Sequence, residues 1–574
     1  MDVEQLKQIY LSRPFKTRNA DEFELQNILD LFIDPTEGLD SPFDYCNCII
    51  KGKMGSGKTM YLRANHAYYL YTLVPCLNEN QKVILPVYIK LSDLSNIQDP
   101  EKIYGAIIIK IIEEIAGVCD YLQSSIELAK LHVGAASLSG LWPSSKEIHQ
   151  VLDKLQKLTS DEYVKSVSTS LTCNGSLTAK FANACAEYGK TSLEEMKRHE
   201  KPAFGWIVDA CTTLIEPFDA KLLILFDEVS SLSKGFFKAS NESDSYFEML
   251  MNQLRTLPYV RTKLAIYPHS ASDILQETRY GDCIELECDP VNNTAQYGSY
   301  LSKTSSLIER YIEKESGIKC NAEDVFNISV QDQLPLEQLI NASEGNMRRL
   351  VHLLDISMNI AYQKSQGAEK VSLEDILEAL RRQGIAMESL YQDADISFLN
   401  SLVKVCRNRS TYRFTFPNKA NTINRYTNRS AEYNIINIRQ AGSGRQGTIY
   451  SFDYAYCIYK DLPTHYVKGT EKIDKFRSTK EGEPIRRVAQ LSDEALEQIE
   501  IRGKIEGTVI NYSGDGDAAL VQGEDHKIYI LLLNNVIQSD RKKSVHGGTK
   551  IRFLPSPISA NGIDALICLE AEIL

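Results

Sequence analysis

Eight consecutive residues near the start of the chain carry the clearest chemical pattern. Gly52 to Thr59 reads GKMGSGKT and matches the phosphate-binding pattern G-x-x-x-x-G-K-S/T at every fixed position. Glycines let the backbone wrap closely round an anion, so that amide N–H groups and a helix N-terminus face the phosphates. In this pattern the lysine reaches the β- and γ-phosphates and the threonine hydroxyl holds Mg²⁺. The residues expected to contact a nucleotide are Gly52, Gly55, Ser56, Gly57, Lys58, Thr59 and Met60.

The residues on either side of this loop decide between a phosphate site and a glycine turn that ends in Lys-Thr by chance. Cys46 to Ile50 is a short apolar run typical of a buried strand, and Met60 to Ala64 can continue as a helix. A strand, a glycine loop and a helix in that order are the context that the phosphate-binding pattern requires. The flanks therefore favour the phosphate site.

A second motif far downstream supplies carboxylates. Lys221 to Glu228 reads KLLILFDE, a continuous apolar strand that ends in two acids. With a phosphate loop upstream, Asp227 is expected to bind the Mg²⁺ shell and Glu228 to orient the attacking water. The alternative is a buried strand whose two acids merely cap a turn.

Length, composition and charge bound the remaining possibilities. A chain of 574 residues is too long for one core and predicts three or four domains. No apolar run approaches bilayer length and no secretory pattern is visible, so we expect a cytoplasmic protein. The thirteen cysteines are scattered without C-x-x-C pairs, so we expect them to be free thiols. The net charge of −12 is uneven: residues 400–490 hold seventeen Lys and Arg against seven Asp and Glu, which is near +10, so the remainder is near −22.

The order of the expected elements indicates an α/β nucleotide-binding core. Val83 to Ile89 and Leu264 to Tyr267 are further apolar runs typical of strands in a parallel sheet. Residues 100–218 are longer than such a core needs and are interpreted as a mainly helical insertion. Helices expected at about 295–316, 335–342, 346–364 and 373–383 form an α-helical lid.

These motifs resemble the AAA+ ATPases, and within them the replication-initiator branch that contains the origin-recognition proteins. The resemblance covers about residues 20–384 and is carried by the phosphate loop, by the strand that ends at Glu228, and by Gly345-Asn346-Met347-Arg348, which is similar to that branch's second sensor. It implies ATP and Mg²⁺ as cofactors and ATP hydrolysis as the reaction. It also implies that Arg348 contacts the γ-phosphate from the lid, and Arg349 is the alternative for this role. The other interpretation of Arg348 is an ordinary solvated residue on a helix.

Two features depart from that family pattern. Tyr267, Pro268, His269 and Ser270 stand where the family usually has a small polar first sensor, so the identity of that residue stays open. The family also supplies an arginine to the neighbouring subunit's site from just before the last core strand. Arg279 is the best candidate and Arg255 the second, with an ordinary surface salt bridge as the alternative for either.

The basic segment follows the lid. A likeness to the winged-helix domain that the replication-initiator relatives carry rests on two expected strands, 433–438 and 448–452, joined by a tip rich in glycine and arginine. Basic residues within the range 400–450 are expected to contact DNA phosphates, with the tip near a minor groove. They are Arg407, Arg409, Arg413, Lys419, Arg425, Arg429, Arg439 and Arg445. The alternative is a basic face that docks on the acidic core.

The last part of the chain is expected to form a small β-barrel. Short strands from Gly503 onward are similar to a cold-shock-type OB barrel, in which Tyr512 and Tyr529 are the available base-stacking surfaces. Asp515 and Asp517 lie where phosphates would pass, and a protein-interaction barrel is the alternative. The expected ranges are 1–288 for the core with its insertion, 289–384 for the lid, 385–470 for the winged-helix-like domain, 471–497 for a linker and 498–574 for the barrel.

Together these patterns predict an oligomeric AAA+ ATPase that couples its nucleotide state to DNA. Two alternatives remain open at this point. One is a nucleotide-gated sensor or scaffold subunit of a bacterial antiphage system that acts through a partner protein. The other is a replication-initiator-like DNA loader.

Overall fold

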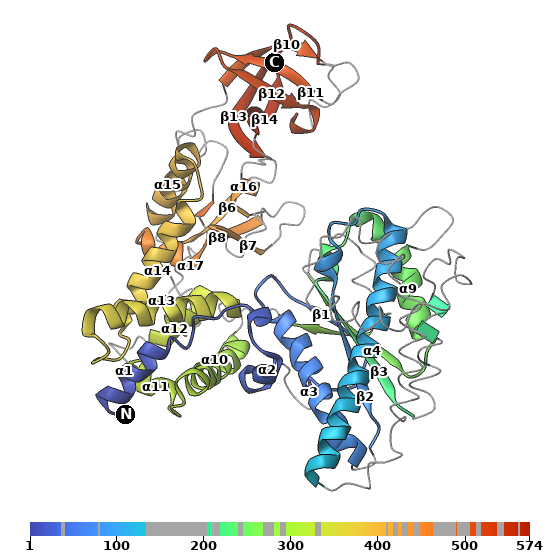
Figure 1. The fold of residues 1–574 in the computed structure, drawn as a ribbon. Helices are drawn as coiled ribbons and strands as arrows, with labels where there is room; N and C mark the ends of the chain where they lie inside the picture. The colour runs from blue at the N-terminus through green and yellow to red at the C-terminus, as the bar shows by residue number, and fades with distance from the viewer. Residues whose placement is uncertain are drawn as a thin grey trace, which may run out of the picture. The chain divides into compact units, whose positions relative to one another are not determined.

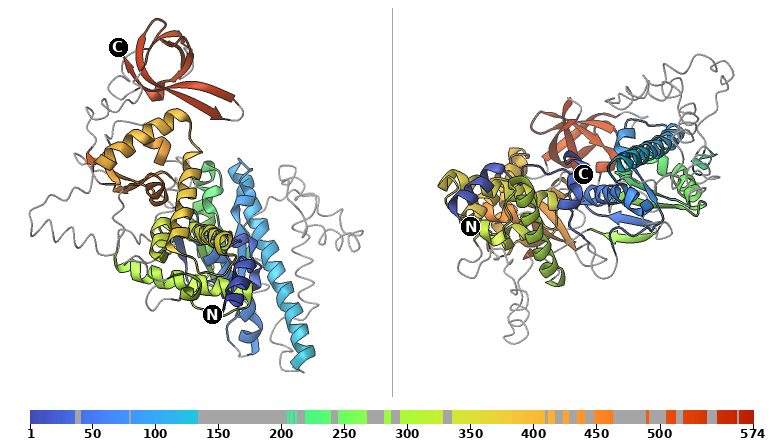
Figure 2. Two further views of the ribbon diagram at one scale, coloured as in Figure 1. Left: turned by 90° about the vertical axis from the view of Figure 1, so that its left-hand side faces the viewer. Right: turned by 60° about the horizontal axis from the view of Figure 1, so that its bottom comes forward.

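In the computed structural model the chain forms two compact units (Figures 1 and 2). The first holds Met1–Ala322 with Ser343–Asp355, and the second holds Glu323–Ala342 with Ile356–Leu574. The residues that the structure describes are 1–35, 41–78, 81–133, 204–205, 207–208, 211, 219–238, 245–267, 281–286, 294–327, 335–408, 411–416, 423–427, 434–440, 448–462, 489–490, 505–512, 518–536, 545–560 and 563–574.

The first unit is built on a five-stranded parallel sheet, as the α/β prediction required. Its strands lie in the order β2-β3-β4-β1-β5. Because the strands are parallel, the loop after β1 and the acids after β3 emerge from the same edge of the sheet. They emerge close together, since β4 alone separates β1 from β3. The bounds are β1 Cys48–Lys51, β2 Ile84–Lys90, β3 Lys221–Asp227, β4 Val260–Ile266 and β5 Asp282–Glu285.

Alternating residues of the strands fill two separate cores, one on each face of the sheet. On β3, Leu223 and Leu225 pack with α2 (Leu25–Leu31) and α3 (Lys58–Asn78), while Leu222, Ile224 and Phe226 face the other way. The opposite core is covered by α4 (Pro100–Val133) and α9 (Tyr246–Arg255). Burial on both faces explains why these strands are continuously apolar in sequence.

Helix α4 opens the range expected to be a helical insertion. Its isoleucines recur at helical spacing, and all six that the sequence pattern selects are buried in the core beneath the sheet. They are Ile103, Ile107, Ile108, Ile111, Ile112 and Ile115. Nearly all of the rest of the 100–218 range lies outside the described residues.

Helices precede and follow the sheet in the first unit. The expected helical approach consists of α1 (Val3–Ser12), a 3₁₀ turn at Ala20–Glu22 and α2. Helix α10 (Thr294–Ser316) and the start of α13 (Met347–Ser365) also belong to this unit, although both fall in the range expected to be a separate lid. The units therefore divide the chain at other places than the 289–384 range. The other helices of that range are α11 Ala322–Val325, α12 Pro335–Ser343 and α14 Leu373–Glu388.

The second unit contains a four-stranded sheet in the order β7-β8-β6-β9. Strands β7 (Ile436–Gln440) and β8 (Thr448–Phe452) form an antiparallel pair where the two wing strands were expected. Arg439, which was expected at the tip, lies on β7 because the strand extends to Gln440. Residues 441–447 with Arg445 lie outside the described residues. Strand β9 (Ala489–Gln490) pairs with β6 (Arg413–Phe416), so the range expected to be a linker contributes to this sheet. The accompanying helices are α15 Asp393–Asn408, α16 Asn424–Thr427 and α17 Tyr454–Tyr459.

The C-terminal strands close into a five-stranded barrel in the order β10-β11-β12-β14-β13. One expectation is wrong here: Tyr529 is 2% exposed, lies in the barrel interior and donates its hydroxyl to Asp525. It sits one residue away from outward-facing Ile528, so the two-residue period of the strand turns its ring inward, and it offers no base-stacking surface. The bounds are β10 Ile505–Tyr512, β11 Ala518–Gly523, β12 Ile528–Leu532, β13 Lys550–Ala560 and β14 Ile563–Ile573.

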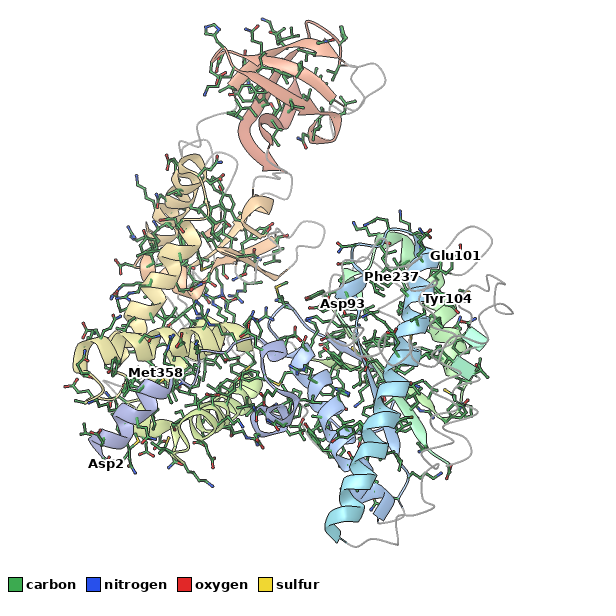
Figure 3. The ribbon with its side chains drawn as sticks, in the orientation of Figure 1. Asp2, Asp93, Glu101, Tyr104, Phe237 and Met358 are labelled. Carbon is green, nitrogen blue, oxygen red and sulfur yellow. The ribbon has the colours of Figure 1, made fainter. Side chains whose placement is uncertain are left out.

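Two further properties concern the described part of the chain. No helix in it is both long and apolar enough to cross a membrane. The cysteines that lie in it form no disulfide bonds with one another. Figure 3 shows the side chains on the ribbon.

Candidate nucleotide site

The phosphate loop connects β1 to α3, in the strand, loop and helix order that the sequence predicts. Gly55 and Gly57 have positive φ values of 80° and 100°, a backbone region that other residues adopt only at a cost. Gly52 is needed for another reason, because a Cβ atom there would lie 2.1 Å from the hydroxyl of Ser56. Backbone conformation therefore favours glycine at Gly55 and Gly57, and the nearby Ser56 side chain favours it at Gly52.

Lys58 begins α3 and is 8% exposed. Its Nζ donates hydrogen bonds to the carbonyl oxygens of Gly52, at 2.7 Å, and Lys53, at 2.8 Å. The same ammonium lies 4.1 Å from the centre of the Tyr267 ring, close enough for a cation–π contact. The lysine is therefore held over its own loop by two carbonyls and an aromatic face.

Asp227, at the end of β3, is 1% exposed and is held from three sides. Its carboxylate accepts hydrogen bonds from the Tyr88 hydroxyl at 2.8 Å, from the Glu228 backbone N–H at 2.8 Å and from the side chain of Thr59. Burial raises the pKa of Asp227, and the bonds from Tyr88 and Thr59 oppose that rise by stabilising the carboxylate. Thr59 and Asp227, the two expected metal ligands, are therefore in contact.

Tyr88 is a site residue that the sequence did not single out. It lies on β2 beside β3, and burial together with Asp227 raises its pKa, so it stays a neutral donor. The only signal in the sequence is a hydroxyl-bearing residue near the end of an otherwise apolar strand.

Glu228 has a left-handed backbone, with φ 54° and ψ 37°. For a residue other than glycine this conformation costs about 1–2 kcal/mol, and such strain concentrates at functional positions. The turn separates Glu228 from the buried strand and brings it to the rim of the same cavity as Asp227.

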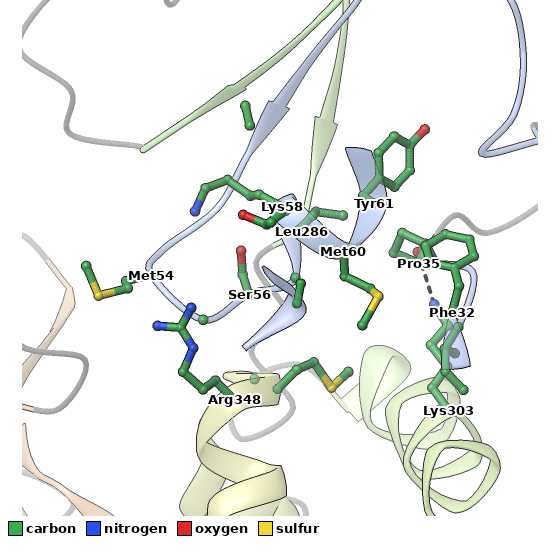
Figure 4. A pocket seen from close by; sticks show the side chains of 18 of the residues that line it. Phe32, Pro35, Met54, Ser56, Lys58, Met60, Tyr61, Leu286, Lys303 and Arg348 are labelled. Atoms are coloured by element: carbon green, nitrogen blue, oxygen red, sulfur yellow. Dashed lines mark hydrogen bonds between the residues drawn. The ribbon is translucent and has the colours of Figure 1, made fainter. Parts of the chain in front are cut away.

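One cavity of about 480 Å³ gathers these residues (Figure 4). Its polar end holds the phosphate loop, both acids and Tyr267, so Lys58 and Asp227 meet across a single space. Its other end is mainly apolar and aromatic and is closed partly by α10, where Lys303 donates a hydrogen bond to the carbonyl of Pro35 at 3.0 Å. The apolar and aromatic residues that line the cavity include Leu31, Phe32, Pro35, Met60, Tyr61, Leu286, Leu307, Tyr311, Met347 and Val351.

The start of α13 completes the polar end. Arg348 lines the cavity, and Figure 4 shows its guanidinium directed toward the phosphate loop beside Ser56. Arg349, the alternative sensor, is buried and is not among the lining residues. Of the two arginines, Arg348 is therefore the one that lines the cavity.

The remaining expected residues are less informative. Arg255 is exposed at the end of α9 and is not among the described residues that line the cavity. Arg279, together with Pro268, His269 and Ser270 of the expected first sensor, lies outside the described residues. Tyr267 is described, and its ring contacts Lys58 where a small polar sensor was expected.

The donor set fits ATP and Mg²⁺. A hard divalent cation prefers oxygen ligands, and Mg²⁺ commonly takes one or two of them from the protein and the rest from phosphates and water. Thr59 and Asp227 supply such oxygens next to the loop, and within the described chain no group of three or more His, Cys, Asp or Glu could hold an ion alone. The apolar end suits a flat base and the glycine loop suits phosphates.

Comparisons with known proteins give a match to one family model over a short part of the chain. No curated protein matches the chain. Among solved structures, the ORC2 protein of Aeropyrum pernix, solved in ADPNP–ADP complexes, matches over 74% of this chain and 88% of that one, with 10% identity and a TM-score of 0.29. A TM-score this low does not establish a common fold. Residues 13–99, which contain β1, the phosphate loop, α3 and β2, match the family model described as ORC-CDC6-like.

Proposed function

We propose that this protein binds ATP with Mg²⁺, hydrolyses it with water as the nucleophile, and couples the nucleotide state to DNA and to oligomer assembly. The observation that carries the proposal is the single cavity shared by Lys58 and Asp227, whose motifs lie far apart in the sequence. The match of residues 13–99 to the ORC-CDC6-like family supports it, because that segment contains the phosphate loop.

The proposed mechanism assigns one task to each residue. Bound Mg²⁺ would neutralise charge on the β- and γ-phosphates, and Thr59 and Asp227 would hold it. Lys58 exchanges the carbonyls of Gly52 and Lys53 for phosphate oxygens. Glu228 orients and polarises the attacking water, and Arg348 neutralises charge that develops on the transferred phosphoryl group. Positioning and charge stabilisation of this kind provide most of the rate in phosphoryl transfer.

We also propose that a neighbouring copy completes the site with Arg279. The parent chain should then show a native mass with ATP that is a multiple of its 64.7 kDa monomer. The Arg279→Ala variant should still assemble but turn over ATP at least about tenfold more slowly, since trans-acting arginines contribute large factors to phosphoryl transfer. A monomeric mass with and without ATP, together with full turnover in Arg279→Ala, would exclude this part of the proposal.

The DNA proposal rests on charge. Residues 400–490 are near +10 in a chain of net charge −12, and Arg439 lies on β7, where its Nε donates to Ser451 of β8 at 2.6 Å. We expect DNA to stimulate ATP turnover, and Arg439→Glu with Arg445→Glu to remove that stimulation while basal turnover remains. The stimulation should also weaken steeply with salt, because contacts to phosphates release counterions.

A control for the DNA experiment changes the same charge elsewhere. Lys102→Glu with Lys319→Glu alters two exposed lysines outside the basic segment and should leave the stimulation intact. Two results would favour a nucleotide-gated scaffold that acts through a protein partner. One is ATP turnover in the parent chain that does not change when DNA is added, and the other is stimulation that persists in the Arg439→Glu, Arg445→Glu variant.

A further inference from the structure

Asn346 connects the phosphate loop to α13 through its side-chain amide. Its Nδ2 donates to the carbonyl of Met54 at 2.9 Å, while its Oδ1 accepts from the backbone N–H of Arg349 at 3.0 Å. The second bond caps α13, since it satisfies a backbone N–H of the first turn. One side chain therefore holds the helix that carries Arg348 and the tip of the loop at the same time.

A second contact joins the same two elements. The backbone N–H of Arg348 donates to the carbonyl of Gly55 at 3.2 Å. Glu344 and Gly345 come directly before Asn346 and have positive φ values of 50° and 79°, respectively. This tight turn places Asn346 against the loop. All of these residues belong to the first unit.

The loop is shaped to receive Asn346. The general phosphate-loop pattern leaves position 55 open, yet this chain has glycine there. A Cβ atom at Gly55 would lie 2.3 Å from Oδ1 and 2.7 Å from Nδ2 of Asn346, so no larger residue fits without displacing the amide. The glycine, the turn and the amide form one fitted contact.

We propose that Asn346 is a positioning residue that sets the reach of Arg348 to the γ-phosphate by fixing α13 to the loop tip. The inference rests on the proposed nucleotide-binding function and deepens it. Because the loop tip and Arg348 are joined through Asn346, a change in the loop on gain or loss of the terminal phosphate is transmitted to α13. The amide acts through Arg348 and does not itself contact the nucleotide.

The Asn346→Asp variant separates the two bonds. Aspartate still caps α13 but has no N–H to donate to Met54. We expect the ratio of the ADP to the ATP dissociation constant to fall about three- to tenfold, the effect of one hydrogen bond, while ADP affinity changes little. Turnover should fall more than the KM for ATP rises. Asn346→Ser is the uncharged control, because serine also caps a helix but lacks the amide that donates to Met54 and adds no negative charge beside the loop.

A double-mutant cycle distinguishes positioning from a general structural role. In the Arg348→Ala background, Asn346→Ser should cause no further loss of ATP discrimination, because the residue through which Asn346 acts is absent. The inference is overturned if Asn346→Asp weakens ATP and ADP equally, if the two substitutions are additive, or if discrimination is unchanged. A parent chain that binds no ATP at all would instead overturn the proposed function, so the two failures can be told apart.

Discussion

The Lys58→Ala variant is expected to bind ATP about a hundredfold more weakly than the parent chain and to show no measurable turnover. Lys58 brings a buried ammonium to the loop, and truncating one partner of a desolvated charge pair costs about 3 kcal/mol, which corresponds to about a hundredfold. Equilibrium binding of a labelled ATP analogue and phosphate release measure the two effects.

The control for this variant lies on the same loop. Lys53→Ala removes the same charge from an exposed side chain and should bind ATP within about threefold of the parent, as expected for screened surface charges. Lys58→Ala also leaves the carbonyls of Gly52 and Lys53 without this donor, so its thermal unfolding should be measured alongside. Intact ATP binding and turnover in a folded Lys58→Ala protein would refute the assignment of the phosphate site.

The Glu228→Gln variant is expected to keep ATP affinity but to lose turnover by about 10²–10⁴-fold, the usual contribution of a positioned general base. Glutamine preserves the shape of the side chain and the backbone hydrogen bond to Asp227. Its neutral amide, however, cannot polarise the attacking water or accept its proton as a carboxylate does. ATP should therefore accumulate unhydrolysed on the protein. Single-turnover phosphate release and the stoichiometry of bound ATP give the measurement.

Glu285 provides the matched control for Glu228. It lies at the end of β5, lines the same cavity and is exposed. Glu285→Gln makes the same chemical change there and should alter turnover by less than about threefold, as surface carboxylates do. A Glu228→Gln protein that hydrolyses ATP at the parent rate would remove Glu228 from the proposed mechanism.

Several parts of this fold follow from local sequence. Gly55 and Gly57 have positive φ values, which glycine adopts most readily, so the shape of the loop at these positions follows from local sequence. The isoleucines of α4 likewise define one buried face by spacing alone. Strand β3 is continuously apolar because it is buried on both faces, and this identifies it as a central strand.

Other features depended on contacts between distant segments. Tyr88 differs little in sequence from any strand tyrosine, and only the pairing of β2 with β3 brings its hydroxyl to Asp227. The interior place of Tyr529 depended on strand register, because a shift of one residue exchanges the two faces of a strand. Strand β9 is two residues long and owes its existence to its partner β6.

By itself, the sequence determined the phosphate loop, the acid pair and the parallel α/β sheet, because backbone geometry and burial restrict which residues can occupy those positions. The tertiary structure alone decided that Tyr267 covers Lys58, that Arg348 and not Arg349 faces the cavity, and that Asn346 joins α13 to the loop. These contacts unite residues far apart in the chain, and no local preference of Tyr, Arg or Asn specifies which distant atom each will meet.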